Sequence, residues 1–257
     1  MIEVRNITFS YGDHMVLDHL SFSAGKGKMI AVLGANGAGK STLFRCMLGI
    51  LRPQDGIIEI DGRDISHMSR REISSKIAYI PQSETPVYNY TVFDTVLMGT
   101  AGSLSPLRSP GKKQTEASQN ALSLLGITDL SDRGINEISG GERQLALLAR
   151  AIAQQSPALL MDEPTANLDY GNQHMVLSRI RELANEGYTI MLSTHNPEHA
   201  LQYADEVLVI KDHRVFASGI IQDVLTQELI YEVYGLRVRT AEVETDGRTI
   251  RSFIALP

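Results

Sequence analysis

A glycine-rich loop constrains this chain more than any other stretch of its sequence. It reads Gly34-Ala35-Asn36-Gly37-Ala38-Gly39-Lys40-Ser41-Thr42 and follows the short apolar run from Met29 to Leu33. Glycines let successive backbone N–H groups turn toward one anion, and a helix that starts there adds the positive end of its dipole. A loop of this composition is also compatible with an ordinary turn. The complete pattern between an apolar strand and a helix nevertheless predicts a cradle for nucleotide phosphates.

Two side chains of the loop carry specific chemistry in such a cradle. Lys40 is expected to reach the outer phosphates, and the Ser41 hydroxyl is expected to ligate Mg²⁺. The other loop residues predicted to contact the nucleotide are Gly34, Asn36, Gly37, Gly39 and Thr42.

Strand and helix patterns alternate along most of the chain. Short apolar runs predict strands at Met29–Leu33, Ile77–Ile80, Ala158–Met161 and Thr189–Ser193, and helical spacing predicts helices at Thr42–Leu51, Leu145–Ala153 and Gly171–Glu186. Alternation of this kind favours a mainly parallel sheet, with ligands at the carboxyl ends of its strands. We therefore expect an α/β fold with a P-loop NTPase core.

Two regions depart from that alternation. At the start, Ile2–Ser10 and Val16–Ser23 predict an N-terminal antiparallel β subdomain, and residues 83–157 predict an inserted α-helical subdomain with a loop at Gly99–Lys113. The core then consists of residues 1–82 and 158–235, and a tail at 236–257 forms a hairpin around Asp246-Gly247.

Composition narrows the class of protein. A chain of 257 residues with 43% hydrophobic content can bury the core of one domain. Its net charge of −6 argues against a surface that mainly attracts nucleic acid. No run of about 18 apolar residues occurs, so we expect any membrane role to come through a partner.

Two adjacent carboxylates follow the predicted strand Ala158–Met161. Asp162 and Glu163 could be ordinary surface groups at a turn, but a phosphate loop upstream makes Asp162 the expected acidic partner of the Mg²⁺ shell. Glu163 is better placed as the general base that polarises the water attacking the γ-phosphate.

Three further side chains are candidates for the nucleotide site. Gln82 follows a strand end, where it could reach Mg²⁺ or water, and His195 follows Thr189–Ser193, where it could contact the γ-phosphate. His195 and His199 also have a spacing seen in zinc sites, but Pro197 lies between them and no third ligand is evident. Tyr11 lies in a glycine turn and could either pack against the hairpin or stack on adenine.

Together these motifs resemble the ATP-binding cassette (ABC) ATPases over nearly the whole chain. The family's order is phosphate loop, Ile138-Ser139-Gly140-Gly141-Glu142, Leu159-Leu160-Met161-Asp162-Glu163, Ala166-Asn167-Leu168-Asp169 and Ser193-Thr194-His195. The Ser-Gly-Gly motif is the most specific of these. In that family it closes on the ATP of a second subunit, so the resemblance implies that Ser139, Gly140, Gly141 and Glu142 complete the site of another copy at the start of a helix beginning near Arg143.

The resemblance also implies roles for single residues. Tyr11 is similar to the adenine-stacking residue, Gln82 to the glutamine that couples the helical lobe, and His195 to the switch histidine. Lys40, Gln82, Glu163 and His195 are the implied catalytic set, with Mg²⁺ held by Ser41, Gln82 and Asp162. Glu142 stands where the family usually has glutamine, which places a negative charge near the partner's nucleotide.

Further segments resemble the importer branch for iron–siderophore, haem and cobalamin chelates, including Ala78-Tyr79-Ile80-Pro81-Gln82 and Asn167-Leu168-Asp169-Tyr170-Gly171. This implies a homodimeric ATPase on the cytoplasmic face of a membrane, bound to permease subunits and served by an extracytoplasmic binding protein. Two other readings remain: a soluble ABC ATPase acting on nucleic acid or ribosomes, and the ATPase of an exporter. A small-molecule kinase is disfavoured, because the Ser-Gly-Gly motif would have no role there.

Overall fold

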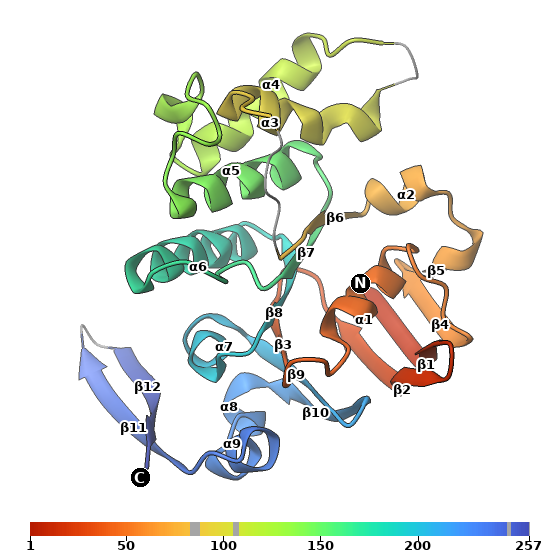
Figure 1. The fold of residues 1–257 in the computed structure, drawn as a ribbon, viewed down its shortest axis with the longest axis vertical. Coiled ribbons are helices and arrows are strands. Elements are labelled where there is room, and N and C mark those ends of the chain that lie inside the picture. Colours follow the sequence, from red (N-terminus) through yellow and green to blue (C-terminus); the bar gives the residue numbers. More distant parts are fainter. Residues whose placement is uncertain (83–87, 105–107, 246–247, 257) are drawn as a thin grey trace.

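The computed structural model describes residues 1–82, 88–104, 108–245 and 248–256. Its N-terminal part is an antiparallel sheet with the strand order β2-β1-β4-β5 (Figure 1). The strands are β1 (Ile2–Tyr11), β2 (His14–Ala24), β4 (Asp55–Ile60) and β5 (Arg63–Asp64). This sheet supplies Tyr11, at the turn between β1 and β2, to one side of the phosphate loop.

A second sheet of six strands runs through the middle of the molecule in the order β10-β9-β3-β8-β7-β6. In the described part of the chain, five of these strands are parallel, and β10 is antiparallel to its neighbour β9. They are β3 (Met29–Leu33), β6 (Ile77–Ile80), β7 (Ala158–Asp162), β8 (Thr189–Thr194), β9 (Glu206–Lys211) and β10 (Arg214–Ile220). Strands β3, β7 and β8 are buried along their whole length, as their apolar runs predict.

The helix after the phosphate loop is shorter than its sequence pattern suggests. Helix α1 spans Lys40–Met47, so the expected range Thr42–Leu51 is wrong at both ends. Gly39 precedes the helix with a left-handed backbone (φ 100°), which places Lys40 in the first turn. At the other end, the amides of Ile50 and Leu51 both bond to the Arg45 carbonyl, which turns the chain away before the apolar pattern stops.

A helical lobe lies beyond the edge strand β6, at the top of Figure 1. It contains α3 (Val92–Leu97), η2 (Met98–Ser103), α4 (Lys112–Leu124), η3 (Thr128–Leu130) and α5 (Gly140–Ala153). The loop expected at Gly99–Lys113 is wrong at both ends, where η2 and the first residues of α4 lie, and residues 105–107 are outside the described part. Gly99 is present because a Cβ there would collide with the Arg150 backbone of α5, so the glycine permits close packing.

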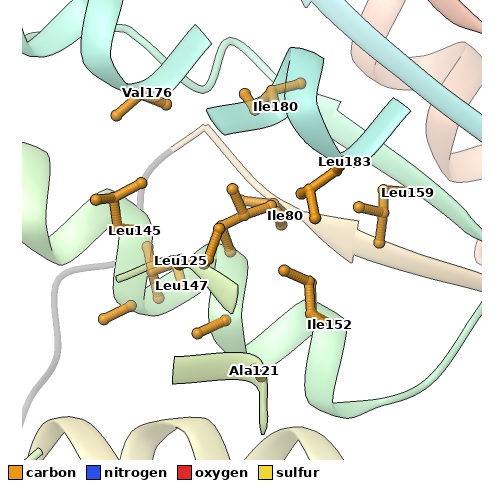
Figure 2. Packing of buried hydrophobic residues seen from close by; sticks show 14 of the residues in the cluster. Ile80, Ala121, Leu125, Leu145, Leu147, Ile152, Leu159, Val176, Ile180 and Leu183 are labelled. Atoms are coloured by element: carbon orange, nitrogen blue, oxygen red, sulfur yellow. The ribbon is translucent and has the colours of Figure 1, made fainter. Parts of the chain in front are cut away.

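Helix α5 joins this lobe to the core. It contacts α3 and α4 on one side and α6 (Tyr170–Asn185) on the other. Figure 2 shows the resulting cluster, in which side chains of α5 lie between those of α4 and α6. The labelled members are Ile80, Ala121, Leu125, Leu145, Leu147, Ile152, Leu159, Val176, Ile180 and Leu183. One continuous apolar cluster therefore ties the lobe to the central sheet.

The C-terminal part packs against the other end of the sheet. It comprises α7 (Pro197–Tyr203), α8 (Ile221–Val224), α9 (Gln227–Tyr234) and a separate hairpin of β11 (Val238–Thr245) and β12 (Arg248–Ala255). Phe253 of β12 donates its backbone N–H to the Glu198 carboxylate of α7. The turn predicted at Asp246-Gly247 lies outside the described residues.

The predicted fold class is confirmed: the chain has a mainly parallel α/β core, an antiparallel N-terminal sheet and a helical insert. The three boundaries given above between the parts of the domain stay predictions. The first boundary of the helical insert, at residue 83, falls among residues that the structure does not describe.

Candidate functional site

The phosphate loop lies at the carboxyl end of β3, where the parallel sheet meets α1. Gly34 is buried, whereas Asn36 and Gly37 are exposed at the tip of the loop. Ser41 and Thr42 follow in the first turn of α1, so their backbone N–H groups belong to the unpaired N-terminal turn that attracts anions.

The Lys40 side chain lies inside its own loop. Its Nζ donates to the carbonyl oxygens of Gly34 at 2.7 Å and Ala35 at 3.2 Å, and the residue is only 6% exposed. Burial lowers the pKa of Lys40, and the nearby Glu163 and Asp162 carboxylates oppose that shift. The lysine is thus held where an anion would enter, beside the two predicted carboxylates.

A cavity of about 520 Å³ opens over this loop. It is lined by Tyr11, His14, Val16, Asn36, Gly37, Ala38, Gly39, Lys40, Ser41, Thr42, Gln82, Glu163 and His195. Residues from the N-terminal sheet, the loop and three strand ends therefore surround one space. Its size suits a small-molecule ligand of nucleotide dimensions.

Asp162 ends β7 beneath the cavity and is 4% exposed. Its Oδ1 accepts a 2.6 Å hydrogen bond from the hydroxyl of Ser193, the residue opposite it on β8. The same hydroxyl accepts the backbone N–H of Glu163 at 2.9 Å. Ser193 therefore fixes both adjacent carboxylate residues through a single buried hydroxyl.

Replacing Ser193 by alanine should destabilise the fold and misplace both carboxylates. Two buried polar groups would lose their partner, so we expect the free energy of unfolding to fall by about 2 kcal/mol. Urea denaturation of Ser193→Ala measures this. Ser118→Ala is the matched control, since Ser118 is equally buried and, among the described residues, its hydroxyl bonds only the Gln114 carbonyl within α4. Equal losses for the two variants would contradict the bridging role.

Three predicted catalytic side chains meet at one oxygen. Glu163 Oε2 accepts from Gln82 Nε2 at 3.0 Å and lies 3.5 Å from His195 Nδ1. Glu163 has a left-handed backbone (φ 45°), an uncommon conformation for a residue with a side chain. Its carboxylate lines the cavity together with Gln82 and His195. The arrangement can hold a water molecule beside a carboxylate that accepts its proton.

Tyr11, which lines the cavity from the end of β1, is both packed and exposed. Its ring meets Phe9 edge-on with centroids 4.8 Å apart, yet 45% of the residue is open to solvent. The two interpretations offered by the sequence are therefore compatible. His14 is opposite Tyr11 across the strand pair and lines the same cavity, a placement that the sequence pattern did not indicate.

The Ser-Gly-Gly segment begins a helix rather than preceding one. Helix α5 starts at Gly140, so the expected start near Arg143 is wrong, and Ser139 is its N-cap. Glu142 Oε2 accepts the Ser139 backbone N–H at 2.8 Å, while Ser139 Oγ accepts the Glu142 N–H at 3.3 Å. This reciprocal capping box explains the early start. The Ser139 amide also lowers the pKa of Glu142, whose charge is therefore engaged within its own chain.

The Ser-Gly-Gly segment does not line the cavity over the phosphate loop. The described residues that line this cavity include none of Ser139, Gly140, Gly141 and Glu142. They lie instead beside the start of α6, which Asp169 caps by accepting the Asn172 amide at 2.9 Å. Within one chain, the structure therefore brings together the loop, Asp162, Glu163, Gln82, His195 and Tyr11, and leaves the Ser-Gly-Gly segment apart.

The donors near the loop are mainly oxygen atoms. Ser41 offers a hydroxyl, Gln82 an amide oxygen and Asp162 a carboxylate, the ligand types that Mg²⁺ prefers. Among the described residues, no group of three or more His, Cys, Asp or Glu side chains is placed to hold a metal ion. His199 is buried on α7 with an unpartnered Nδ1, whereas His195 is exposed at the cavity.

Comparison with known proteins identifies the family. A family model described as ABC transporter matches residues 17–166. An iron chelatin transport ATP-binding protein of Helicobacter pylori, described as probable, is 36% identical, over 91% of this chain and 92% of its own length. The ferric enterobactin transport ATP-binding protein FepC of Escherichia coli is 33% identical, over 91% and 86%.

Solved structures give the same picture. An ABC transporter described as metal-chelate type, in an inward-facing conformation, matches with a TM-score of 0.89 and 32% identity, over 100% of this chain and 97% of that one. A nucleotide-free ATP-binding cassette from an ABC transporter matches with a TM-score of 0.82 and 27% identity, over 91% and 98%. In the described ranges, no helix combines the length and apolar character needed to cross a bilayer.

Proposed function

The chain belongs to the ABC transporter family as an ATP-binding subunit, and we propose that it hydrolyses ATP to drive uptake of a metal chelate through a membrane permease. The observation that carries the proposal is the cavity in which the phosphate loop faces Glu163, Gln82 and His195. Relatives named for iron chelate and enterobactin transport favour import of an iron–siderophore or a related chelate over export.

In this proposal the loop from Gly34 to Thr42 binds the phosphates, and Tyr11 stacks on adenine. Ser41, Gln82 and Asp162 hold Mg²⁺, which neutralises charge on the phosphates when it is bound with ATP. One protein carboxylate is sufficient because Mg²⁺ commonly completes its coordination with phosphate oxygens and water.

Glu163 then acts as the base for hydrolysis. Its carboxylate accepts a proton from the attacking water, while Gln82 keeps that carboxylate in place through the 3.0 Å hydrogen bond. His195 lies at the open side of the same oxygen, where its ring can meet the terminal phosphate.

The site of one chain is half of the working unit in this proposal. Ser139, Gly140, Gly141 and Glu142 lie outside the cavity of their own chain, at the positive end of α5. The N-terminal N–H groups of a 14-residue helix suit a γ-phosphate presented by a second copy. ATP bound between two copies would close the dimer, and its hydrolysis would open it.

A mixing experiment tests the shared site. Lys40→Ala removes the loop function and Ser139→Arg blocks the Ser-Gly-Gly segment, so each variant alone should have no ATPase activity. A mixed dimer has one site with both parts intact, so an equal mixture should recover about a quarter of wild-type activity. The double variant mixed with either single variant forms no intact site and should stay inactive. Failure of the single variants to complement each other would contradict the shared site.

This chain has a groove that suits the proposed membrane partner. A cavity of about 340 Å³ lies between the end of α1, the short helix α2 (Arg70–Ser74), β6 and the end of α5. Ile50 at its rim is 59% exposed, which suits an apolar segment of a permease subunit. We propose that the chain docks there from the cytoplasmic face, and that an extracytoplasmic binding protein delivers the chelate to the permease.

Uptake assays test the cargo. In cells that lack this chain, uptake of radiolabelled ferric siderophore, haem and cobalamin is measured in turn, with and without the wild-type protein. Restored uptake of at least one chelate by the wild type, and of none by Glu163→Gln, is expected. Normal uptake of all three without the chain would contradict the import proposal.

A further inference from the structure

Tyr79 lies between the permease groove and the nucleotide site. It belongs to β6, the edge strand of the central sheet on the side of the helical lobe (Figure 1). Its ring lines the 340 Å³ groove, and its hydroxyl donates to Asp162 Oδ2 at 3.5 Å. No other residue lines this groove and also bonds a predicted metal ligand, among the contacts of the described residues.

The groove around Tyr79 is made by separate elements that meet at one place. Leu48, Gly49 and Ile50 follow α1, Ile73 and Ser74 end α2, and Gln154 caps the end of α5. The Gln154 amide donates to the carbonyls of Ser74 and Ile77, so α5 is bonded to the start of β6. A segment bound in the groove would therefore press on the strand that carries Tyr79.

The contact with Asp162 is sensitive to such pressure. At 3.5 Å it is at the long limit of a hydrogen bond, so a small shift of the ring would either strengthen the bond or break it. The other oxygen of Asp162 is held firmly by Ser193 at 2.6 Å. A shift of Tyr79 would consequently act on Oδ2 of Asp162, while Ser193 keeps Oδ1 in place.

We propose that Tyr79 is a positioning residue that couples occupancy of the groove to Asp162 and, through it, to the metal of the nucleotide. The inference rests on the proposed function, because it assigns the metal to Asp162 and the permease to the groove. The Tyr79 side chain is half-buried, and its hydroxyl donates to the Asp162 carboxylate.

The absence of tryptophan in the sequence offers a direct test. Ile50→Trp places a single indole at the rim of the groove, and a Glu163→Gln background prevents turnover. Emission of that indole is followed while ATP is added without metal and Mg²⁺ is then titrated. With Tyr79 present, we expect Mg²⁺ to change the emission. In Tyr79→Phe the change should be lost, or should need about three- to tenfold more Mg²⁺.

Tyr188→Phe is the matched control, because Tyr188 is another half-buried tyrosine and lines a different cavity, beyond the far end of α6. It should leave the Mg²⁺ response unchanged. Affinity for metal-free ATP, measured separately with a fluorescent analogue, should be equal in all variants.

The outcomes separate two failures. An equal Mg²⁺ response in the Tyr79→Phe variant and in its parent would overturn the coupling while leaving ATP binding intact. If Mg²⁺ changes the indole emission in neither protein, the coupling is overturned as well. Failure of the parent, which retains Tyr79, to bind ATP would instead contradict the proposed function itself.

Discussion

Glu163→Gln is expected to bind ATP with close to wild-type affinity and to lose at least about 100-fold in turnover. The substitution keeps the size and the hydrogen-bonding shape of the side chain, so Gln82 and His195 retain a neighbour at the same place. An amide, however, cannot take a proton from water. The variant should therefore hold ATP without consuming it.

Steady-state ATPase assays and equilibrium binding measure the two halves of this prediction. Size-exclusion chromatography with Mg²⁺-ATP should also reveal a stable dimer of Glu163→Gln that dissociates when nucleotide is removed. Glu186→Gln, an exposed carboxylate at the end of α6, is the control. Hydrolysis by Glu163→Gln at the wild-type rate would exclude Glu163 as the base.

Lys40→Ala should lose ATP binding by about 10- to 100-fold, with no measurable turnover. The ammonium group is the charge most deeply placed in the phosphate loop, and its hydrogen bonds to Gly34 and Ala35 hold it there. Lys40 itself lines the cavity, so water can take the place of its side chain beside those carbonyls and the fold should persist.

Isothermal titration with ATP tests this loss, and thermal unfolding checks that the protein remains folded. Lys113→Ala, at an exposed position on α4, should bind ATP as the wild type does. Wild-type affinity in a folded Lys40→Ala protein would remove the lysine from the phosphate site.

The sequence predicted the arrangement around the phosphate loop because each part is encoded locally. The apolar run before Gly34 and the helix after Lys40 are neighbours in the chain, and Asp162 follows its own strand directly. In a parallel sheet such strand ends meet at one edge, so their residues could be grouped before the strand order was known.

Contacts that depend on strand order could not be predicted in the same way. Ser193 bonds Asp162 because β8 pairs with β7 in a register that places the two residues opposite each other. Tyr79 reaches the same carboxylate because β6 is the other neighbour of β7. Both residues lay within recognised motifs, but the sequence alone does not say which strands adjoin.

The errors at helix ends have a different cause. Ser139 and Glu142 satisfy one another's backbone N–H groups, which allowed α5 to include two glycines that helical propensity disfavours. The sequence pattern predicts a loop at Gly99, but the small size of this residue serves the approach of η2 to the Arg150 backbone. In each case a contact outweighed the local preference of the residue.

Helix α5 also has a mechanical property. Its 14 residues extend about 21 Å at the usual rise per residue, with Ser139 at one tip and Gln154 at the other. The first tip is proposed to touch a partner's ATP, and the second is hydrogen-bonded to Ser74 and Ile77, which line the groove where we propose that a permease docks. A helix of this length moves as one rigid element. When two subunits close around ATP, the end of α5 at Gln154 would therefore be displaced against the membrane partner. The internal structure of the helix would not change.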